Sequence, residues 1–584
     1  MKIVICTTPI RPTPTDYPPF GSLAVLQALR EAGYDPVFLD IDGLRPSFAQ
    51  VLDRLQAEAP DVIGISAVVS TAYGYVKKFC QAVRAVLPST KLVLGGNLAA
   101  SAEILHRLCH IDVCVIGEGE RIIVNLARYY REHVGHDDFS QLEKIKGITY
   151  LDPKGEMIFT GYEAAIPAHE LLDPDFSILE THSNIRNFIA DPFARESFAA
   201  DPRSHEPHRK GQKMATVVSA KGCVARCTFC HRWDKGFRQV PPGKVVERIN
   251  YLKNRYNVGF IQFGDENFGS DRKATEELIR LIKPLDILWH VGGVRVCSVD
   301  RDLLRRMKDA GCVSLYFGFE TGSPDILEVM EKKLDLEDND NAARWMHETG
   351  LSTIYQLVLG MPGENRRTLE ETIEMVKRIT EFLPEPPAKY LSVNYIQALP
   401  GTPVYEYARA KGMIGISLQE EEAYLLEISD IDAGDDTKFI NFTEYPYLAV
   451  QSWRTRLLFE TTVHWHHAVH RRASQPPNGT VRELEADYEK GGYFNRQTVA
   501  HHPLLLQALY PIRGLAIWTR TLWSQYRRAP TRVFFIHLWE LVTWPFKSRQ
   551  IHRDYRSLRH VMRDVAPKPK TNTEAMMMPL RLGR

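Results

Sequence analysis

Two long stretches of this chain alternate short apolar strands with helical patterns, and this rhythm limits the fold more than any other feature. In the first stretch, strands are predicted over residues 2–6, 36–40, 61–67, 91–95 and 112–116. Helical patterns between them cover residues 21–32, 47–58, 73–87 and 102–108. Apolar strands that alternate with helices are typical of parallel sheets. The pattern predicts an α/β fold whose N-terminal domain, residues 1–162, is a doubly wound parallel sheet closed by a β-hairpin at residues 148–161.

The second stretch, residues 214–410, repeats the rhythm six times. Its strands are predicted over residues 214–219, 258–263, 287–291, 313–317, 353–359 and 390–397. Six such units predict a partial (β/α)6 barrel, in which the carboxyl ends of the strands carry the site. Residues 163–213 are irregular and are interpreted as a linker. Residues 411–584, where the rhythm stops, are interpreted as a mainly helical C-terminal domain.

Small and polar residues follow the strands of the first stretch. They are Ser66, Gly95, Gly96, Gly117 and Glu118. Ligands of doubly wound sheets bind at the carboxyl ends of the strands, and glycines there let a bulky ligand approach the backbone. Tight turns alone would also explain these glycines. The first turn lacks the G-x-G-x-x-G pattern of nicotinamide dinucleotide sites, which argues against that cofactor.

Three cysteines with the spacing C-x3-C-x2-C follow the first strand of the second stretch. They are Cys223, Cys227 and Cys230. Thiolates are the protein ligands of iron–sulfur clusters, and three of them would leave one iron of a four-iron cluster without a protein ligand. A Cys3His zinc site with His231 is the alternative. Structural zinc sites usually take ligand pairs from two separated segments, and the sequence offers no second pair.

Polar residues also follow the other strands of the second stretch. They are Gly264, Asp265 and Glu266 after the second strand, Arg295 after the third, Glu320 after the fourth, and Gly360, Met361 and Pro362 after the fifth. A carboxylate at a strand end often caps the next helix, which is the simpler explanation for any one of them. These residues and the cysteine loop all follow strands of the same predicted sheet, so they are expected at the same edge of it, which favours one shared site instead.

Composition describes the setting of these motifs. The chain has 584 residues with 44% hydrophobic and 25% charged, which is typical of a globular protein with several domains. A formal net charge of +1 gives no reason to expect a nucleic-acid partner. The six remaining cysteines (Cys6, Cys80, Cys109, Cys114, Cys297, Cys312) lie in apolar contexts, as small buried side chains would. With no signal or transmembrane pattern, the expected location is the cytoplasm.

With this loop and this order of domains, the first 410 residues or so resemble radical SAM enzymes of the class that binds cobalamin. The resemblance implies that Cys223, Cys227 and Cys230 hold a [4Fe-4S] cluster whose fourth iron binds S-adenosylmethionine. It implies S-adenosylmethionine contacts from Gly264, Asp265, Glu266, Arg295, Glu320, Gly360, Met361 and Pro362. It also implies cobalamin contacts from Ser66, Gly95, Gly96, Gly117 and Glu118. The D-x-H-x-x-G motif that supplies a lower cobalt ligand is absent, so that ligand is left open.

The resemblance implies a radical SAM enzyme that methylates an unactivated carbon. The alternative is an oxidase, cyclase or rearrangement enzyme that acts on a hydrophobic or tetrapyrrole-like substrate without methyl transfer. A non-catalytic sensor would have no need of the cysteine loop. The expected partners are a small-molecule or lipid-like substrate and an electron donor such as flavodoxin or ferredoxin. No residue is assigned as catalytic.

The C-terminal domain carries two weaker signals. His466 and His470 are one helical turn apart and could bind a metal, although a polar helix face explains them more simply. Residues 504–549 combine tryptophans with arginines, which is typical either of a helix in peripheral contact with a membrane or of a helical cap on the barrel. The tail after Pro567 has the composition of a disordered terminus.

Overall fold

The structure is a computed structural model that describes residues 1–473 apart from 12, 134–136, 172–173, 232–235, 430–437 and 452. The described residues form two compact units, each taken by itself below. The first contains residues 1–292 and 398–429, and the second contains residues 293–397 and 438–473. The division into four domains at residues 162, 213 and 410 stays a prediction.

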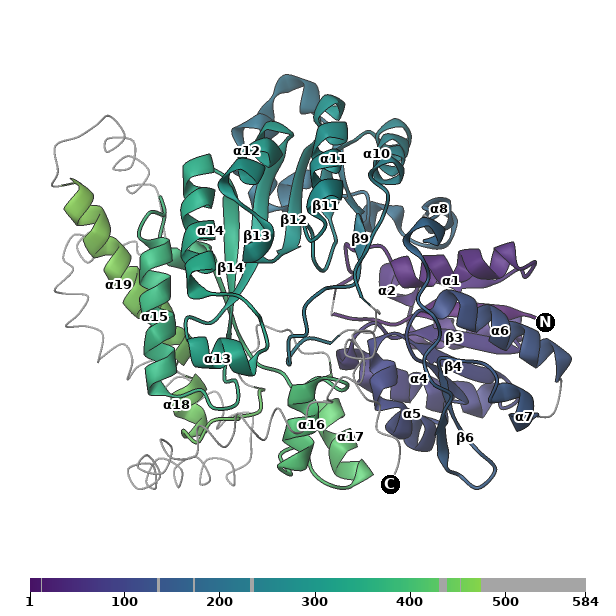
Figure 1. Cartoon of the computed structure of the whole chain (residues 1–584). Helices are drawn as coiled ribbons and strands as arrows, with labels where there is room; N and C mark the ends of the chain where they lie inside the picture. The colour runs from purple at the N-terminus through teal and green to yellow at the C-terminus, as the bar shows by residue number, and fades with distance from the viewer. Residues whose placement is uncertain are drawn as a thin grey trace. The chain divides into compact units, whose positions relative to one another are not determined.

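The first unit begins with a seven-stranded sheet in the order β2-β1-β3-β4-β5-β6-β7 (Figure 1). Its strands are β1 (Ile3–Thr7), β2 (Val37–Leu39), β3 (Val62–Ser66), β4 (Lys91–Gly95), β5 (Val113–Val115), β6 (Ile148–Leu151) and β7 (Met157–Phe159). The first five are parallel, with Val4 paired to Ile63 and Ile63 to Leu92. Strands β6 and β7 form the antiparallel hairpin that closes the sheet. The predicted doubly wound sheet and its hairpin are confirmed.

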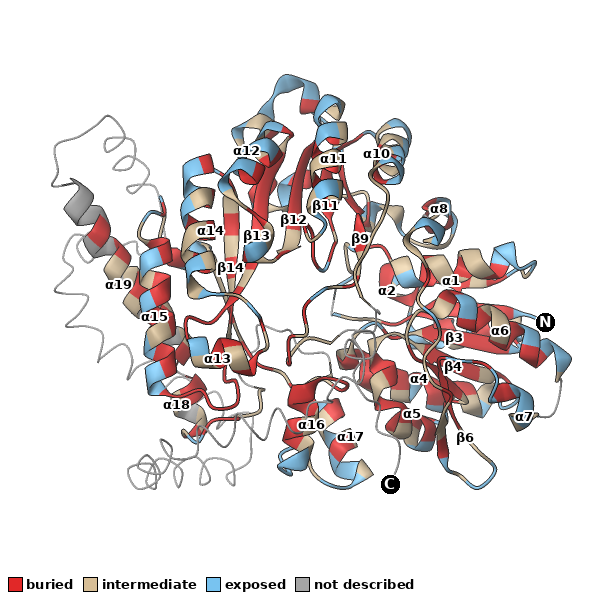
Figure 2. Ribbon diagram, viewed as in Figure 1, coloured by how far each residue is buried: buried red, intermediate tan, exposed pale blue. Residues whose placement is uncertain are grey.

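Helices separate these strands because their apolar positions recur with helical spacing. They are α1 (Phe20–Glu31), α2 (Ile41–Leu44), α3 (Phe48–Glu58), α4 (Tyr73–Val86), α5 (Ala102–Cys109), α6 (Gly119–Glu132) and α7 (Phe139–Leu142). Helix α3 begins with a capping box in which Ser47 and Gln50 bond each other's backbone N–H groups. The strands are buried while the outer faces of the helices are exposed, as Figure 2 shows. The core therefore lies between the helices and the sheet.

The scattered cysteines behave as buried apolar side chains, with one exception. Cys6, Cys80, Cys109, Cys114 and Cys312 are buried. Burial raises the pKa of the Cys6 thiol to about 12 and that of Cys109 to about 11, so both stay protonated at neutral pH. Cys297 is exposed, so the expectation of burial is wrong for this residue. It lies in the short 3-10 turn Val296–Ser298 just after a strand, where the backbone has left the apolar sheet.

Residues 163–213 contain short helices, including α8 (Ser177–His182) and α9 (Glu196–Ala199). Three aromatic side chains of this segment, Phe176, Phe188 and Phe198, are at most 2% exposed. Ala190 pairs with Met214 in an isolated antiparallel bridge. The segment is thus irregular, as its sequence indicates, but it contributes buried side chains to the first unit, of which it is part.

The first unit also contains the opening strands of the second sheet. They are β8 (Lys213–Val217), β11 (Val258–Phe263) and β12 (Leu288–Val294), which run parallel with β11 between the other two. Helices α10 (Pro242–Tyr256) and α11 (Arg272–Ile282) connect them. Two very short strands, β9 (Ala220–Lys221) and β10 (Arg238–Gln239), pair antiparallel on either side of the cysteines. This small hairpin is absent from the sequence prediction.

The first unit also includes α16 (Pro403–Ala410) and α17 (Leu418–Glu427). Helix α17 packs on α4, where Glu422 accepts a hydrogen bond of 2.5 Å from the hydroxyl of Tyr73 and lies 2.6 Å from Nζ of Lys77. Helix α17 agrees with the mainly helical character predicted for residues 411–584.

The second unit continues from β12 with three more parallel strands, β13 (Cys312–Glu320), β14 (Ser352–Leu359) and β15 (Leu391–Tyr395). Its connecting helices are α12 (Arg301–Asp309), α13 (Pro324–Val329), α14 (Leu336–Thr349) and α15 (Arg366–Thr380). All six strands predicted for residues 214–410 are present. The α/β fold class is confirmed, whereas the pattern did not indicate the β9–β10 hairpin, helix α6 or the exact ends of some elements.

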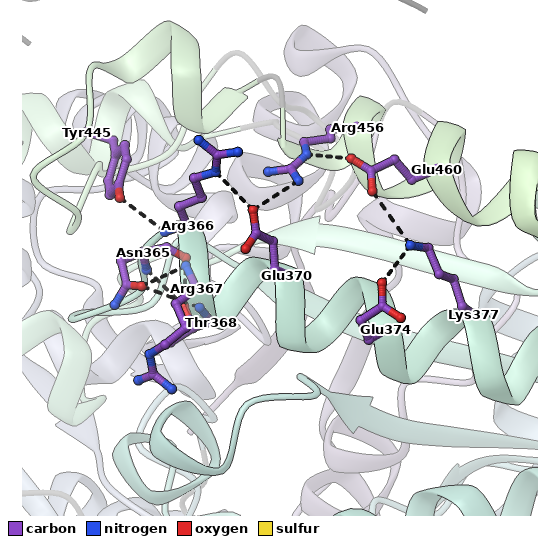
Figure 3. Close-up of polar contacts among 10 residues, drawn as sticks. All are labelled: Asn365, Arg366, Arg367, Thr368, Glu370, Glu374, Lys377, Tyr445, Arg456 and Glu460. Atoms are coloured by element: carbon purple, nitrogen blue, oxygen red, sulfur yellow. Dashed lines mark hydrogen bonds and ion pairs between the residues drawn. The ribbon is translucent and has the colours of Figure 1, made fainter. Parts of the chain in front are cut away.

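The second unit ends in α18 (Tyr447–Gln451) and α19 (Trp453–Ala473). Helix α19 packs on α15, and an alternating row of charges joins them (Figure 3). Arg456 bonds Glu460 at 2.7 Å and Glu370 at 3.4 Å, while Lys377 lies 3.9 Å from Glu460. The indole of Trp465 is 1% exposed and donates to the carbonyl of Leu383. The described start of the C-terminal domain is therefore a packed helix.

Several predictions for the C-terminal domain concern residues or side chains that the structure does not describe. The side chains of His466 and His470, residues 504–549 and the tail after Pro567 lie outside the described residues. Within the described part of the chain, no helix has the length and apolar character needed to cross a bilayer.

Candidate functional site

One cavity in the first unit contains all five residues predicted to contact cobalamin. Its volume is about 390 Å³, in the range of small-molecule sites. Its wall includes Ser66, Gly95, Gly96, Gly117 and Glu118. These residues follow β3, β4 and β5, whose parallel alignment brings their carboxyl ends to one edge. The grouping of the five residues is observed, and their contact with cobalamin stays a prediction.

Two glycines of this wall have backbone conformations that favour glycine. A Cβ atom on Gly96 would lie 2.4 Å from the carbonyl oxygen of Ala67, and its φ of +93° is one that other residues rarely adopt. Gly117 has a φ of +100°, and no atom lies within 4 Å of the position that its Cβ would take. Gly96 therefore lets the backbone pack closely, and Gly117 leaves open space that fits a bulky cofactor such as a corrinoid.

Three residues of the cysteine-bearing region also line this cavity. They are Lys221, His231 and Glu266. Lys221 stands two positions before Cys223, and His231 directly follows Cys230. Burial lowers the pKa of His231 to about 4, so its imidazole is neutral. The sequence predicted Glu266 as an S-adenosylmethionine contact and gave Lys221 no role. The position of Lys221, a basic residue at the edge of the cysteine loop, could have indicated that it belongs to the site.

Both carboxylate oxygens of Glu118 are bound by the protein. Oε1 lies 2.7 Å from Nη1 of Arg238 and 2.8 Å from Nζ of Lys221. Oε2 accepts from the backbone N–H of Ile166, also at 2.8 Å. Burial disfavours the charged form of Glu118, but Lys221, Ile166 and Arg238 together hold its pKa below the ordinary value. Glu118 is therefore an ionised, hydrogen-bonded side chain in the cavity wall.

The three cysteines lie on the turn after β9. Gly222 opens the turn with a φ of +77°, Cys227 is buried, and Cys223 and Cys230 are half-buried. The N–H of Ala225 points at Sγ of Cys223 at 3.4 Å. Among the described residues, no three Cys, His, Asp or Glu side chains converge closely enough to hold one metal ion. The donor set fits an iron–sulfur cluster, and convergence of the thiols would accompany its binding.

Asp265 fixes the backbone next to the cysteine turn. Its Oδ1 accepts from the N–H of Ser219 at 2.8 Å and from the N–H of Ala220. The side chain is only 5% exposed, and burial raises the pKa of Asp265 to about 7 although both N–H groups favour the charged form. Gly264 beside it fits tightly, because a Cβ atom there would lie 3.0 Å from Cγ2 of Thr216. Asp265 thus joins the end of β11 to the end of β8.

Within the second unit, Arg295 and Glu320 are two of the residues predicted to contact S-adenosylmethionine, and the side chains of both contact the turn that contains Lys332. Arg295 donates from Nη2 to the carbonyls of Lys332 and Lys333 at 2.8 and 3.1 Å. Nζ of Lys332 in turn lies 2.5 Å from Oε1 of Glu320, whose backbone has a positive φ of 61°. Arg295 and Glu320 are therefore brought to the same place through Lys332, which the sequence reasoning did not single out.

A buried carboxylate also organises the predicted Gly360-Met361-Pro362 segment. Glu364 accepts from the N–H of Gly360 and, at 3.2 Å, from the N–H of Met361. Glu364 is 2% exposed, and burial raises its pKa to about 8. Gly360 has a φ of +86°. The turn after β14 is thus held by a carboxylate two residues beyond the predicted segment, and the segment's contact with S-adenosylmethionine stays a prediction.

Comparisons with known proteins agree with these two regions. The B12 binding domain model matches residues 8–127, and the radical SAM superfamily model matches residues 217–376. The chain is also similar to the solved structure of OxsB, a cobalamin-dependent S-adenosylmethionine radical enzyme. The superposition covers 97% of this chain and 83% of OxsB, with a TM-score of 0.60 at 14% identity. This likeness concerns the fold.

Two curated relatives differ in the activity that their names state. An anaerobic magnesium-protoporphyrin IX monomethyl ester cyclase of Cereibacter sphaeroides is 30% identical over 371 residues, which cover 62% of this chain and 56% of the cyclase. An uncharacterized methyltransferase of Pyrococcus horikoshii is 26% identical over 438 residues, which cover 71% of this chain and 84% of that protein. This chain therefore spans less than two thirds of the cyclase.

Proposed function

We propose that this chain, which belongs to the radical SAM superfamily and carries a B12-binding domain, is an enzyme that methylates an unactivated carbon of its substrate. It would use a [4Fe-4S] cluster, S-adenosylmethionine and cobalamin. The observation that carries the proposal is the composition of one cavity wall. Strand-end glycines of the first sheet share that wall with Lys221, His231 and Glu266, which flank the cysteines or follow the neighbouring strand.

The chain's own residues have distinct tasks in this proposal. Cys223, Cys227 and Cys230 hold the cluster. Asp265 keeps the turn before them in place through the N–H groups of Ser219 and Ala220. Gly117 leaves room for the corrinoid, because no atom lies within 4 Å of the position of a Cβ there, and Gly96 lets the backbone pack against Ala67.

Within the second unit, the residues proposed to contact S-adenosylmethionine are Arg295, Glu320, Gly360, Met361 and Pro362. Glu364 and Lys332 hold their backbone and side chains in place. When bound, the cluster and S-adenosylmethionine supply a 5′-deoxyadenosyl radical that abstracts hydrogen from carbon, and the corrinoid supplies a methyl group.

The proposed substrate is a small molecule of the tetrapyrrole class. Support comes from the cyclase relative, whose name states a magnesium-protoporphyrin ester as its substrate. We further propose a flavodoxin or ferredoxin as electron donor and the cytoplasm as the location. If the protein contacts a membrane peripherally, we propose that residues 504–549 make the contact. No feature of the described residues calls for nucleic acid.

The decisive experiment is product analysis with the anaerobically reconstituted protein. With a magnesium porphyrin ester or a related tetrapyrrole, S-adenosylmethionine carrying a deuterated methyl group should yield S-adenosylhomocysteine and 5′-deoxyadenosine in similar amounts, with a mass increase in the substrate. Replacing Cys223, Cys227 and Cys230 by Ala should abolish 5′-deoxyadenosine formation. If cleavage of S-adenosylmethionine persists in that variant, the proposed role of the three cysteines is wrong.

A second candidate is a radical SAM cyclase or oxidase that transfers no methyl group. The identity to a cyclase, higher than that to the methyltransferase, favours it. The same assay separates the two functions. Formation of 5′-deoxyadenosine without S-adenosylhomocysteine, and without label in the product, would identify this second candidate.

A further inference from the structure

Two positive side chains stand directly opposite each other beside the cysteine turn. Lys221 on β9 pairs with Arg238 on β10 in antiparallel register. Like charges opposite each other in a two-stranded ribbon are destabilising, and a ribbon with two residues in each strand has little stability of its own. The hairpin therefore needs a negative partner from outside its two strands.

Glu118 is that partner, although it lies more than 100 residues earlier in the chain. Arg238 contacts both of its oxygens, at 2.7 and 2.8 Å, and Lys221 lies 2.8 Å from Oε1. The side chains of Glu118 and Arg238 are 9% and 11% exposed, whereas Lys221 is 32% exposed. Removing one partner from such a buried group is costly, because the remaining charges lose their compensation.

The same carboxylate belongs to the cavity wall. Glu118 immediately precedes α6, between Gly117 and Gly119, and all three line the cavity together with Lys221. A molecule that fills the cavity orders the residues around it. Since Glu118 and Lys221 are bonded to each other, ordering of the wall also orders the strand that leads into Cys223.

We propose that Glu118 is a positioning residue that fastens the strands flanking the cluster cysteines to the wall of the N-terminal cavity, so that a corrinoid in the cavity stabilises the cluster. The inference rests on the proposed function, because it takes the cysteines as cluster ligands and the cavity as the corrinoid site. Its own content is the coupling between the two sites. Coupling is reciprocal, so the cluster must strengthen corrinoid binding by the same factor by which the corrinoid strengthens cluster binding.

The test measures one rate and one equilibrium constant in the full chain under anaerobic conditions. One is the rate at which a ferrous chelator removes iron, with and without saturating hydroxocobalamin. The other is the dissociation constant of hydroxocobalamin for cluster-loaded and cluster-free protein. In the wild type, hydroxocobalamin should slow iron loss, and the cluster should tighten hydroxocobalamin binding, each by roughly five-fold or more. In Glu118→Gln both ratios should fall close to one.

Hydrogen exchange gives a readout that does not depend on either cofactor. The N–H of Val240 bonds the carbonyl of Ser219 at 2.9 Å across the base of the hairpin. Exchange at Val240 and in β9 should accelerate in Glu118→Gln. The matched control is Glu170→Gln, which removes an exposed ion pair of 2.6 Å with Arg121 on α6 and should change neither ratio.

Arg238→Met removes the side chain that contacts both oxygens of Glu118 and carries the same expectation, so it tests the proposal if Glu118→Gln does not fold. Wild-type ratios in either folded variant would overturn the proposal. So would a wild type that binds both cofactors without mutual effect, and in that case the proposed function would stand. A chain that binds neither cofactor would overturn the proposed function and this inference together.

Discussion

The two parallel sheets of this protein differ in what stands at the carboxyl ends of their strands. In the first sheet, the ends of β4 and β5 lead into Gly96 and Gly117, both with positive φ, and a cavity of about 390 Å³ lies beside them. In the second, the ends of β11 and β14 are followed by Asp265 and Glu364, buried carboxylates that each accept bonds from two backbone N–H groups.

This difference separates two ways of making a binding site. The first sheet has glycines at its strand ends, and Gly96 packs directly against the backbone of Ala67, so an added atom there should damage the site. The second sheet pins its turns with hydrogen bonds to buried acids, so removal of an acceptor should damage it. Burial also raises the pKa of Asp265 and of Glu364 into the neutral range, which makes the second group of turns sensitive to pH.

The largest effect is expected from Asp265→Ala. The variant leaves the N–H groups of Ser219 and Ala220 without their acceptor, at a cost of about 1–3 kcal/mol for each buried donor. Chemical denaturation of the cluster-free protein measures the loss, and iron content after reconstitution should also fall. Asp265→Asn keeps an acceptor oxygen and should lose much less. Equal losses in the two variants would show that these bonds do not hold the turn.

Gly96→Ala tests the first sheet in the opposite direction. The new Cβ would lie 2.4 Å from the carbonyl oxygen of Ala67 at a φ of +93°, so a destabilisation of about 2–4 kcal/mol and a loss of hydroxocobalamin binding are expected. The control is Gly243→Ala in α10, outside the cavity wall, where no atom lies within 4 Å of the added Cβ. That change should be neutral or stabilising by up to about 1 kcal/mol. Similar stability of both variants would contradict the comparison.

Glu364→Gln should change the pH dependence of stability. The folded pKa of about 8 exceeds the ordinary value of 4.5, so the folded state holds this proton more tightly than the unfolded state. The resulting stabilisation is complete below pH 4.5 and is lost as pH rises through 8, with a slope of up to about 1.4 kcal/mol per pH unit. Urea denaturation at several pH values between 5 and 8 should show a flatter profile for the variant.

The control for this profile is Glu370→Gln on α15. Hydrogen bonding with Arg366 holds the pKa of Glu370 below its ordinary value, so this group contributes no slope between pH 5 and 8. A wild-type profile as flat as that of Glu364→Gln would refute the shifted pKa.

The smallest effect on stability is expected at the cysteines outside the cysteine loop, of which one is exposed and the others are buried. Cys297 is exposed, whereas Cys6 is fully buried with a pKa of about 12. A thiol reagent should modify Cys297 rapidly in the folded protein and leave Cys6 untouched until unfolding. Cys297→Ser should remove one rapidly reacting thiol and change the free energy of unfolding by less than about 0.5 kcal/mol. Rapid labelling of Cys6 would mean that the first sheet opens locally.

Local patterns in the sequence were sufficient for the strands of the two large sheets and for several of the helices between them. The predicted strands at residues 91–95 and 258–263 have the observed bounds, and α3 begins where Ser47 and Gln50 form their cap. The spacing of apolar residues depends on neighbours a few positions away, so it is readable without the fold. The cysteine spacing and the glycines at strand ends are equally local, and the five predicted cavity residues do lie in one wall.

Contacts between distant parts of the chain were not readable in this way. The sequence predicted Glu118 as a cofactor contact, but its two oxygens are bound by Lys221, Arg238 and Ile166, between 48 and 120 positions away. The hairpin of β9 and β10 also escaped prediction because two residues per strand carry no periodic signal. Lys332 and Glu364 stand outside the predicted segments, and only the folded turns show what they hold.

The sequence by itself thus determined the order of strands and helices, the cysteine loop and the strand ends at which ligands of such sheets bind. The tertiary structure alone decided which buried charge meets which partner, and therefore that the wall of the first cavity is bonded to the strands around the cysteines. The physical reason is the range of the forces. Backbone propensity and apolar periodicity act within a few residues, whereas the pairing of a buried carboxylate depends on every element that excludes water from it.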